Sequence, residues 1–474
     1  MMSSIDELIA RLGDIPIETN SKIVRGKSRD FFWYSPVLKE KLDHVVGDAI
    51  VSPRSEQEVV QVLAACWALD IPVTPRGGGT GNYAQSMPLA GGVVLDMTRM
   101  NKIKSIGDGV LVVEPGALMG DIEKETRSNS GQELRMHPST RETATIGGFI
   151  SGGSGGIGSI RWGMLREPGN ILRVRLATLE ETPQLIDVVG EEINAIHHAY
   201  GVNGIITEVE VPLVPAQNWV ELIVSFKDWM ECVKTGWKVA HHEGLWLKQL
   251  AAIQVPAPHA YFTRHRKFLE EDDSVLCILA AANALVPLTK IIEKAGARIA
   301  YQSDTATDEE KKGLPHLHHL AWNHTTLRAL RAEPEITYLQ VGTPPDDPLP
   351  ALEEIAKQFP DEIIGHIEFA RSAGRVFASF LPMYRFSTEE RLNEVVHSLE
   401  ALGCPCYNPH AYTYEEGNRT GPDPAKLNLK KRTDPKGLMN PGKMIGWESP
   451  DYTYNPEGGY QYSGLQAPPE ESAG

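Results

Sequence analysis

The first clear pattern of apolar and polar positions lies between residues 49 and 75 and predicts a strand, a helix and a second strand. The helix would begin at the capping box Ser55-x-x-Glu58, and the β-rich segment IPVTP follows it. Its apolar positions form one stripe that could cover a sheet: Val59, Val60, Val62, Leu63, Cys66 and Trp67. We therefore expect a βαβ unit here, with further strands at GGVVLDM and GVLVVEPG.

Two glycine-rich segments follow. RGGGTGN runs from Arg76 to Asn82, and TIGGFISGGSGGIGSIRWG runs from Thr145 to Gly163. Because glycine at this density costs backbone entropy on folding, these segments indicate close approach to a ligand or to another backbone. In RGGGTGN, successive backbone N–H groups can point into one concavity that binds an anion; a plain tight turn is the alternative.

Two nucleotide-binding motifs match in letters but lack the required context. Gly153-x-Gly155-x-x-Gly158 satisfies the dinucleotide fingerprint, yet SIRWGMLREPGN follows it instead of the expected helix with an acidic residue beyond. Residues 437–443 resemble a phosphate-binding P-loop, yet Met444 stands where a Ser or Thr must bind magnesium. Neither motif is favoured.

The pattern changes between about residues 217 and 403. Strand-like segments such as ELIVSF, VLCILAA and RVFASFLP alternate with predicted helices at 228–241 and 387–402, which is typical of an α+β domain with a largely antiparallel sheet. The tail from residue 448 shows no periodicity and is expected to be irregular. The expected divisions are a first domain at 1–215, a second at 216–405, a return to the first at 406–447, and the tail at 448–474.

Charge and composition exclude several classes of protein. The net charge of −16, from 46 Lys and Arg against 62 Asp and Glu, opposes binding of a polyanion, so no nucleic-acid partner is expected. The five cysteines are few and odd in number, and Cys404-Pro-Cys406 has the wrong spacing for a C-x-x-C motif, so free thiols are expected. The N-terminal segment carries a capping box at Ser4-x-x-Glu7 instead of an export signal, and the longest uncharged stretch, 274–289, is too short to span a membrane. A cytoplasmic protein without a transmembrane segment is expected.

An ordered series of segments carries a resemblance to a known family. VSPRSEQEVVQVL, IPVTPRGGGTGN, GGVVLDMTRMNKI, VVEPGA, HPST, TATIGG, RWG, GIITEVEVPLVP and DPKGLMNPGKM are similar to the vanillyl-alcohol-oxidase (PCMH-type) FAD-binding family. The chain most resembles its FAD-linked oxidase branch, which includes glycolate oxidase and D-lactate dehydrogenase-like enzymes. The resemblance covers residues 40–215 and 430–446. It implies an α+β fold, in which an α+β cap lies over the flavin of a two-subdomain PCMH-type FAD-binding domain.

The resemblance also implies which residues hold FAD. The first glycine loop would bind the pyrophosphate, and other segments would contact the flavin, the dinucleotide and the adenine end. In that order the expected residues are Arg76, Gly77, Gly78, Gly79, Thr80, Gly81 and Asn82; Pro138, Ser139, Thr145, Gly147 and Gly148; Ser151, Gly152 and Gly153; and Ile205 and Ile206. Asn440 and Lys443 would return the C-terminal segment to the flavin.

Departures from the family refine these expectations. Thr80 stands where tethered members keep a histidine, and no cysteine lies between Cys66 and Cys232, so noncovalent FAD is expected. Phe149 replaces the Asn that often follows TIGG, and SGGSGG replaces ATNAGG. The metal-binding H-x-G-D-G-N-x-H segment of the 2-hydroxy-acid dehydrogenases is absent, and GHIEFARSAGR occupies the comparable region. These departures weaken the case for a simple 2-hydroxy acid as substrate.

Hydride transfer to a flavin also requires a base that removes the hydroxyl proton. His410 and Tyr412 in YNPHAYTY are the leading candidates, followed by His366 and Arg371; ordinary loop and strand roles are the alternatives. His324, with Arg328, is a candidate for binding an anionic or aromatic substrate. The neighbouring cluster His316, His318 and His319 lies in a helical-looking stretch without a suitably spaced carboxylate, so no metal is expected there.

The sequence thus predicts an FAD-dependent oxidoreductase that oxidises a small alcohol or hydroxy acid by hydride transfer to flavin N5. Two alternatives remain. One is a non-redox flavin-dependent transferase of the alkylglycerone-phosphate synthase type, and the other is a flavin-binding module without catalysis. The substrate, the electron acceptor and the oligomeric state, including a homodimer, stay open.

Overall fold

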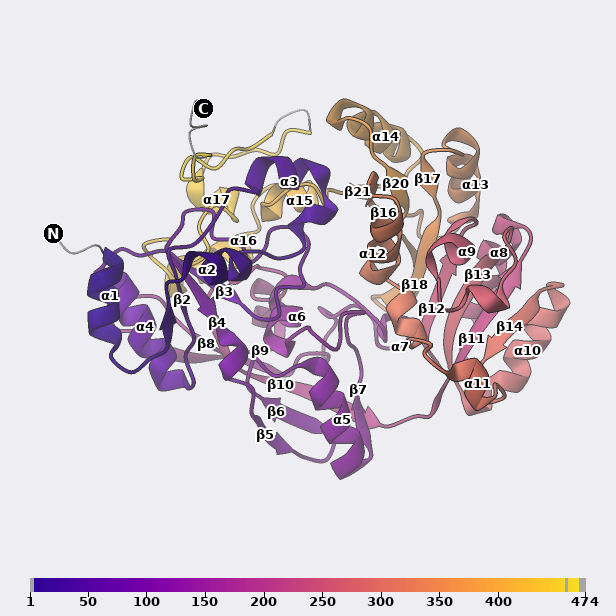
Figure 1. Cartoon of the computed structure of the whole chain (residues 1–474), viewed down its shortest axis with the longest axis horizontal. Coiled ribbons are helices and arrows are strands. Elements are labelled where there is room, and N and C mark those ends of the chain that lie inside the picture. The colour runs from indigo at the N-terminus through magenta and orange to yellow at the C-terminus, as the bar shows by residue number, and fades with distance from the viewer. Residues whose placement is uncertain (1–3, 457–458, 469–474) are drawn as a thin grey trace.

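The computed structural model describes residues 4–456 and 459–468 and shows two lobes joined side by side (Figure 1). The N-terminal lobe contains the elements up to β10 and the C-terminal helices α15–α17, whereas the cap lobe contains the elements from β11 to β21. The α+β fold class predicted from the sequence is confirmed.

The N-terminal lobe begins with a four-stranded sheet in the order β1-β2-β4-β3. Its strands are β1 (Ile17–Glu18), β2 (Ala49–Val51), β3 (Val73–Arg76) and β4 (Val93–Asp96). The predicted helix is present as α4 (Glu56–Ala68), and the Ser55 side chain caps it by accepting the Glu58 N–H. The reciprocal half of the predicted capping box is not formed, because the Glu58 carboxylate accepts the Arg54 N–H at 2.6 Å. β2, β4 and β3 are parallel, with β4 inserted between the two strands that α4 connects. The βαβ prediction is confirmed.

A second, antiparallel sheet completes this lobe in the order β5-β6-β10-β8-β9, with β7 also pairing with β10. Its strands are β5 (Ile103–Ile106), β6 (Val110–Val113), β7 (Gln132–Leu134), β8 (Arg173–Ala177), β9 (Leu185–Val189) and β10 (Ile205–Pro215). The helices of this lobe are α1 (Ser4–Leu12), α2 (Ser21–Lys27), α3 (Pro36–Leu42), α5 (Met119–Ser130), α6 (Ile146–Gly152) and the single turn α7 (Ser159–Trp162).

The cap lobe is built on an eight-stranded antiparallel sheet in the order β14-β11-β13-β12-β18-β19-β16-β21. Its strands are β11 (Trp219–Phe226), β12 (Leu247–Ile253), β13 (Ser274–Ala281), β14 (Arg298–Gln302), β16 (Gln340–Gly342), β18 (His366–Ser372), β19 (Arg375–Phe380) and β21 (Cys406–Tyr407). A small sheet, β15-β20-β17, adds β15 (Ile336–Tyr338), β17 (Ile363–Ile364) and β20 (Met383–Arg385).

Successive residues of a strand point to opposite faces of the sheet. In the large cap sheet both sets of side chains are apolar, so both faces are covered. Leu222, Leu250 and Ile278 pack on one face beneath α8 (Trp229–Ala240), α10 (Leu285–Lys294), α13 (Leu349–Gln358) and α14 (Glu389–Ala401). Their neighbours Ile223 and Ala251 pack on the other face with α9 (Ala257–Tyr261) and α12 (Asn323–Ala332). The predicted antiparallel α+β domain is confirmed.

One predicted helix is wrong in its extent. The helical-looking stretch around His316–His324 is interrupted: a 3-10 turn at Leu317–Leu320 ends before α12 begins at Asn323. The break falls at Trp322, whose φ of 51° and ψ of −138° lie in a region that L-residues rarely adopt. Tertiary contacts hold this conformation, which the sequence pattern does not indicate.

The C-terminal segment returns to the N-terminal lobe through α15 (Tyr414–Asn418), α16 (Pro424–Thr433) and α17 (Ile445–Glu448). The Asn440 N–H donates to the carbonyl of Val73, the first residue of β3, at 2.8 Å. Beyond Glu448 the described residues form no helix or strand, yet the Gln466 side chain donates to the Val46 carbonyl at 2.7 Å. The described part of the predicted irregular tail, residues 449–456 and 459–468, therefore packs on this lobe as an arm without helix or strand.

All five cysteines are free and buried, which confirms the predicted free thiols. Among the described residues, no helix has the length and apolar character needed to cross a membrane.

Candidate active site

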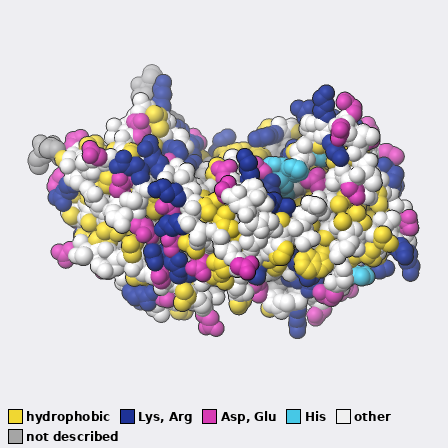
Figure 2. All heavy atoms as spheres, turned by 90° about the horizontal axis from the view of Figure 1, so that it is seen from below, with side chains coloured by type: hydrophobic (Ala, Val, Ile, Leu, Met, Phe, Trp, Pro, Cys, Tyr) yellow, Lys and Arg dark blue, Asp and Glu magenta, His cyan; other side chains and the backbone are white. Residues whose placement is uncertain are grey.

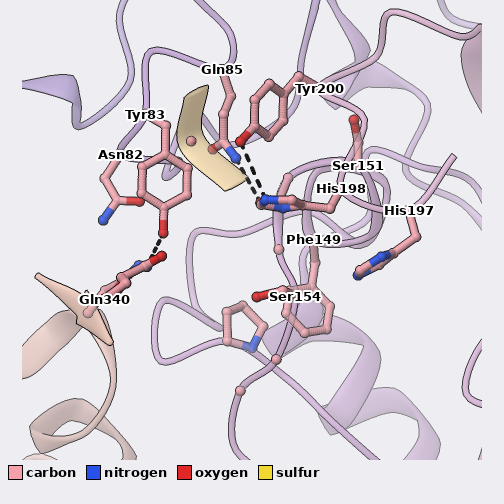
Figure 3. Close-up of a pocket in the computed structure, with 18 of the residues that line it drawn as sticks. Asn82, Tyr83, Gln85, Phe149, Ser151, Ser154, His197, His198, Tyr200 and Gln340 are labelled. Atoms are coloured by element: carbon pink, nitrogen blue, oxygen red, sulfur yellow. Dashed lines mark hydrogen bonds between the residues drawn. The ribbon is translucent and has the colours of Figure 1, made fainter. Parts of the chain in front are cut away.

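A cavity of about 860 Å³ lies where the two glycine-rich segments of the N-terminal lobe face the cap lobe. Its wall includes the loop after β3, the segment around α6, the cap strands β16 and β19, and the C-terminal helices α15 and α16. In Figure 3, Tyr83 and Gln340 lie on one side of this space and His198 and Tyr200 on the other. The cavity thus gathers segments that are far apart in the sequence.

The first glycine loop presents free backbone donors to this cavity. Within the described residues, the N–H groups of residues 78–82 have no hydrogen-bond acceptor, and the buried Nδ2 of Asn82 also lacks a partner. Residues 78–81 are half-buried and line the cavity, and successive N–H groups without an acceptor in such a glycine loop form a concavity that suits an anionic ligand. The loop fits the pyrophosphate of a dinucleotide, the group for which the sequence predicted it.

The loop reaches this position because it lacks side chains. A Cβ at Gly77 would lie 2.1 Å from Thr145 Oγ1, and a Cβ at Gly78 would lie 2.0 Å from the Thr143 carbonyl oxygen. Gly79 has a φ of +65°, which favours glycine. The two glycine-rich regions therefore pack against each other directly, and both line the cavity.

Most of the residues predicted to bind FAD lie in the cavity wall. They are Gly77, Gly78, Gly79, Thr80, Gly81, Asn82, Pro138, Ser139, Thr145, Gly148, Ser151, Gly152 and Gly153. Gly147 lies behind the wall, where its N–H donates to the Pro115 carbonyl at 2.9 Å. Ile205 packs in the core beneath the first sheet, and Ile206 packs in the core of the second sheet. Arg76 lies on the other side of the loop, where its buried Nε has no hydrogen-bond partner among the described residues.

Asn440 and Lys443 support the wall from behind. Asn440 Nδ2 donates to the carbonyls of Gln85 at 2.7 Å and Tyr200 at 2.6 Å, and Lys443 Nζ donates to the Ala84 carbonyl at 2.5 Å. Burial lowers the pKa of Lys443 to about 7 and raises the pKa of the nearby Asp30 to about 6. Both side chains tie the C-terminal segment to the stretch that follows the glycine loop.

The structure places the leading base candidates, His410 and Tyr412, outside the cavity lining. His410 Nε2 faces the Tyr338 carbonyl at 3.1 Å and must donate to it, while Nδ1 accepts from the Ser35 hydroxyl at 2.7 Å. The Tyr412 hydroxyl accepts the Tyr462 N–H at 3.0 Å. Both ring nitrogens of His410 are thus occupied by protein groups.

His366, Arg371 and His324 are not among the lining residues either. His366 is fully buried and its Nε2 lies 2.8 Å from Glu368 Oε1, which also accepts the Trp322 N–H at 2.6 Å. Arg371 donates to the Ile160 carbonyl at 3.0 Å and pairs with Glu243. Through Glu368, the His366 pair holds Trp322 in its rare conformation, and Trp322 itself lines the cavity.

The cavity contains a histidine–tyrosine pair that the sequence analysis missed. His198 Nδ1 lies 2.9 Å from the Gly152 carbonyl and must donate to it, which leaves the lone pair on Nε2; the Tyr200 hydroxyl lies 3.4 Å from that atom. Burial lowers the pKa of His198 to about 4. His198 and Tyr200 have φ angles of 52° and 55°. Residues with such rarely adopted backbone conformations cluster at functional sites. The segment HHAYG, residues 197–201, has no pattern from which this conformation could be predicted.

Tyr83 and Gln340 connect the glycine loop to the cap lobe through a hydrogen bond between the Tyr83 hydroxyl and the Gln340 amide (Figure 3). Burial raises the pKa of Tyr83 to about 12, so its hydroxyl keeps its proton at neutral pH. This contact closes one side of the cavity between the lobes.

Comparisons with known proteins agree with this geometry. Residues 47–182 match the model of a family described as an FAD binding domain. The chain is 26% identical to glycolate oxidase subunit GlcD of Bacillus subtilis (strain 168), over 84% of this chain and 89% of that protein. It is 23% identical to a D-lactate dehydrogenase of Archaeoglobus fulgidus, over 84% of this chain and 91% of that protein.

A solved structure of alkyldihydroxyacetonephosphate synthase has the same fold, with a TM-score of 0.69. The match covers 93% of this chain and 84% of that one at 17% sequence identity. At this identity the likeness concerns the fold alone. The segment matched by the family model contains both glycine-rich segments, residues 76–82 and 145–163.

Proposed function

Because residues 47–182 are an FAD binding domain and FAD is the cofactor, we propose that this chain is a dehydrogenase or oxidase that oxidises a small alcohol or hydroxy acid at its CH–OH carbon. The names of the two relatives, which match most of the chain, support a hydroxy acid. The observation that carries the proposal is a neutral imidazole, His198, in the wall of the cavity that also contains the unpaired glycine loop.

When bound, FAD supplies a two-electron acceptor for the hydride that leaves the substrate carbon. The N–H groups of residues 78–82 would hold its pyrophosphate, with Asn82 Nδ2 as an additional donor. Asn440 and Lys443 would keep this loop in place through the carbonyls of Ala84 and Gln85. FAD would be bound without a covalent link, because the loop offers Thr80 where a tether would need a histidine.

His198 would take the hydroxyl proton of the substrate on Nε2. The Gly152 carbonyl fixes the proton of the ring on Nδ1, so Nε2 is the basic nitrogen. The Tyr200 hydroxyl now faces this nitrogen at 3.4 Å, a long hydrogen bond that a substrate hydroxyl can replace. A base held in one tautomer by a carbonyl is the arrangement that proton abstraction needs.

The cap lobe would position the substrate and exclude water. Trp322, Phe377 and Leu381 contribute apolar surface to the cavity, and Gln340, Thr343 and Ser379 contribute polar groups. Polar groups placed among apolar side chains fix the orientation of a small ligand. Glu368 accepts the backbone N–H of Trp322 and so fixes the main chain of this residue at the cavity wall.

Anaerobic mixing with a panel of alcohols and 2-hydroxy acids tests this proposal. We expect at least one compound to bleach the flavin absorbance at a saturable rate. A flavin that stays oxidised with every member of the panel would contradict the proposal. A transferase that uses flavin without net redox chemistry, or a binding module, would then be the better interpretation.

The pH dependence of flavin reduction provides a second test. A histidine with an ordinary pKa becomes protonated as the pH falls through about 6.5, and a reaction that uses it as the base then slows. Because burial lowers the pKa of His198 to about 4, its Nε2 stays unprotonated at pH 5 to 7, and the rate should fall only as the pH approaches about 4. Stopped-flow measurement with saturating substrate gives this profile. If the rate of flavin reduction falls near pH 6.5 instead, a group other than His198 takes the proton.

A further inference from the structure

Glu142, His318 and His319 form a cluster where the two lobes meet. Glu142 belongs to the N-terminal lobe, whereas the two histidines lie on the 3-10 turn that precedes α12 in the cap lobe. Figure 2 shows histidine side chains gathered in the hollow between the lobes. The carboxylate that the sequence analysis found missing from the histidine cluster is thus supplied from 176 residues away.

The donor atoms lie close enough together to share one cation, with each imidazole facing a different oxygen of the Glu142 carboxylate. His318 Nε2 lies 3.3 Å from Glu142 Oε1, and His319 Nε2 lies 3.5 Å from Glu142 Oε2. Bonds of about 2.0–2.1 Å to zinc place two tetrahedral ligands about 3.3–3.4 Å apart. The three groups can each offer one ligand atom, and these atoms lie within 4.8 Å of one another. The same distances are long for hydrogen bonds.

The neighbouring charges leave room for a cation. Arg141 contacts only Oε1 of Glu142, at 3.1 and 3.2 Å, so Oε2 remains available. Arg328 donates to the backbone carbonyl of His319 at 2.8 Å. This hydrogen bond involves the main chain of the 3-10 turn and leaves the imidazole ring of His319 uninvolved. Among the described residues, neither arginine forms a hydrogen bond with Nε2 of His318 or His319 or with Oε2 of Glu142.

His324 provides a second, independent observation. Its Nδ1 is buried without a hydrogen-bond partner among the described residues, and its ring centroid lies 5.3 Å from that of His319. A three-ligand zinc site keeps a fourth position for water or substrate. Water bound at that position would supply the partner that His324 Nδ1 lacks.

We propose that Glu142, His318 and His319 bind one divalent transition-metal ion of the zinc class. This inference does not depend on the proposed oxidation reaction. The ion would link the lobes beside the cavity, because Thr140 and Trp322, which both line it, lie two and three residues from the ligands. The H-x-G-D-G-N-x-H segment contributes nothing to this site, since the chain lacks it.

Equilibrium dialysis of the flavin-loaded full chain against Zn²⁺, after treatment with a chelator, tests the site by elemental analysis. We expect one bound ion per chain, and Co²⁺ in its place should give the visible spectrum of a tetrahedral site. His319→Gln and Glu142→Gln should each weaken binding by more than about 100-fold, beyond the effect of losing an outer-shell partner. Unchanged flavin content shows that each variant is folded.

His316→Gln is the matched control, because His316 is exposed and pairs with Glu221. It should bind Zn²⁺ as the unaltered chain does. The proposal fails if the chain binds no stoichiometric Zn²⁺, or if neither ligand variant changes the affinity. It also fails if His316→Gln lowers the affinity as much as they do, because the metal would then bind to surface histidines in general.

Discussion

Gly78→Asp is expected to yield protein that purifies almost without FAD. A Cβ at this position would lie 2.0 Å from the Thr143 carbonyl oxygen, so the loop must move away from the second glycine-rich region. The added carboxylate would also compete with the pyrophosphate for the free N–H groups of the loop. Loss of two hydrogen bonds to a charged group, at about 1.5–3 kcal/mol each, weakens binding by about 10²- to 10⁴-fold.

The ratio of flavin to protein absorbance in the purified variant measures this loss, and titration with added FAD gives the dissociation constant. Gly421→Asp is the control, because Gly421 is exposed and an added Cβ there has no neighbour within 4 Å. If Gly78→Asp purifies with its full content of flavin, the loop does not bind the pyrophosphate. Acid precipitation of the unaltered protein should release FAD into the supernatant, as expected for noncovalent binding.

His198→Ala is expected to slow anaerobic flavin reduction by about 10²- to 10⁴-fold, the range for loss of a general base. The variant keeps the glycine loop and the Asn440 contacts, so it should still bind FAD, and its flavin content is measured alongside the rate. Stopped-flow absorbance gives the rate, and imidazole added to the variant should restore part of it. The decline in rate near pH 4 should disappear in the variant.

Two further variants complete this test. His242→Gln changes an exposed histidine and should leave the rate unchanged. His410→Gln removes the hydrogen bonds to Ser35 and the Tyr338 carbonyl, so we expect a lower melting temperature and a nearly normal rate. If His410→Gln slows reduction and His198→Ala does not, the base is the residue that the sequence favoured.

Local patterns in the sequence were enough for several features. The Ser55 cap, the apolar stripe of α4 and the alternating strands of the cap each depend on neighbours within a few residues, and all are present. RGGGTGN predicted an anion-binding loop because the absence of side chains is itself visible in the letters. FAD followed from the order of these segments along the chain.

The catalytic and metal-binding candidates depended on contacts between distant residues. Gly152 fixes the tautomer of His198 from 46 residues away, and Glu142 meets His318 from the other lobe. The same packing places His410 behind the cavity wall, although its motif lies just before the segment that returns to the N-terminal lobe. Periodicity and spacing report only on neighbours along the chain. The sequence therefore indicated a glycine loop suited to an anion, whereas tertiary packing decided which side chains face the cavity.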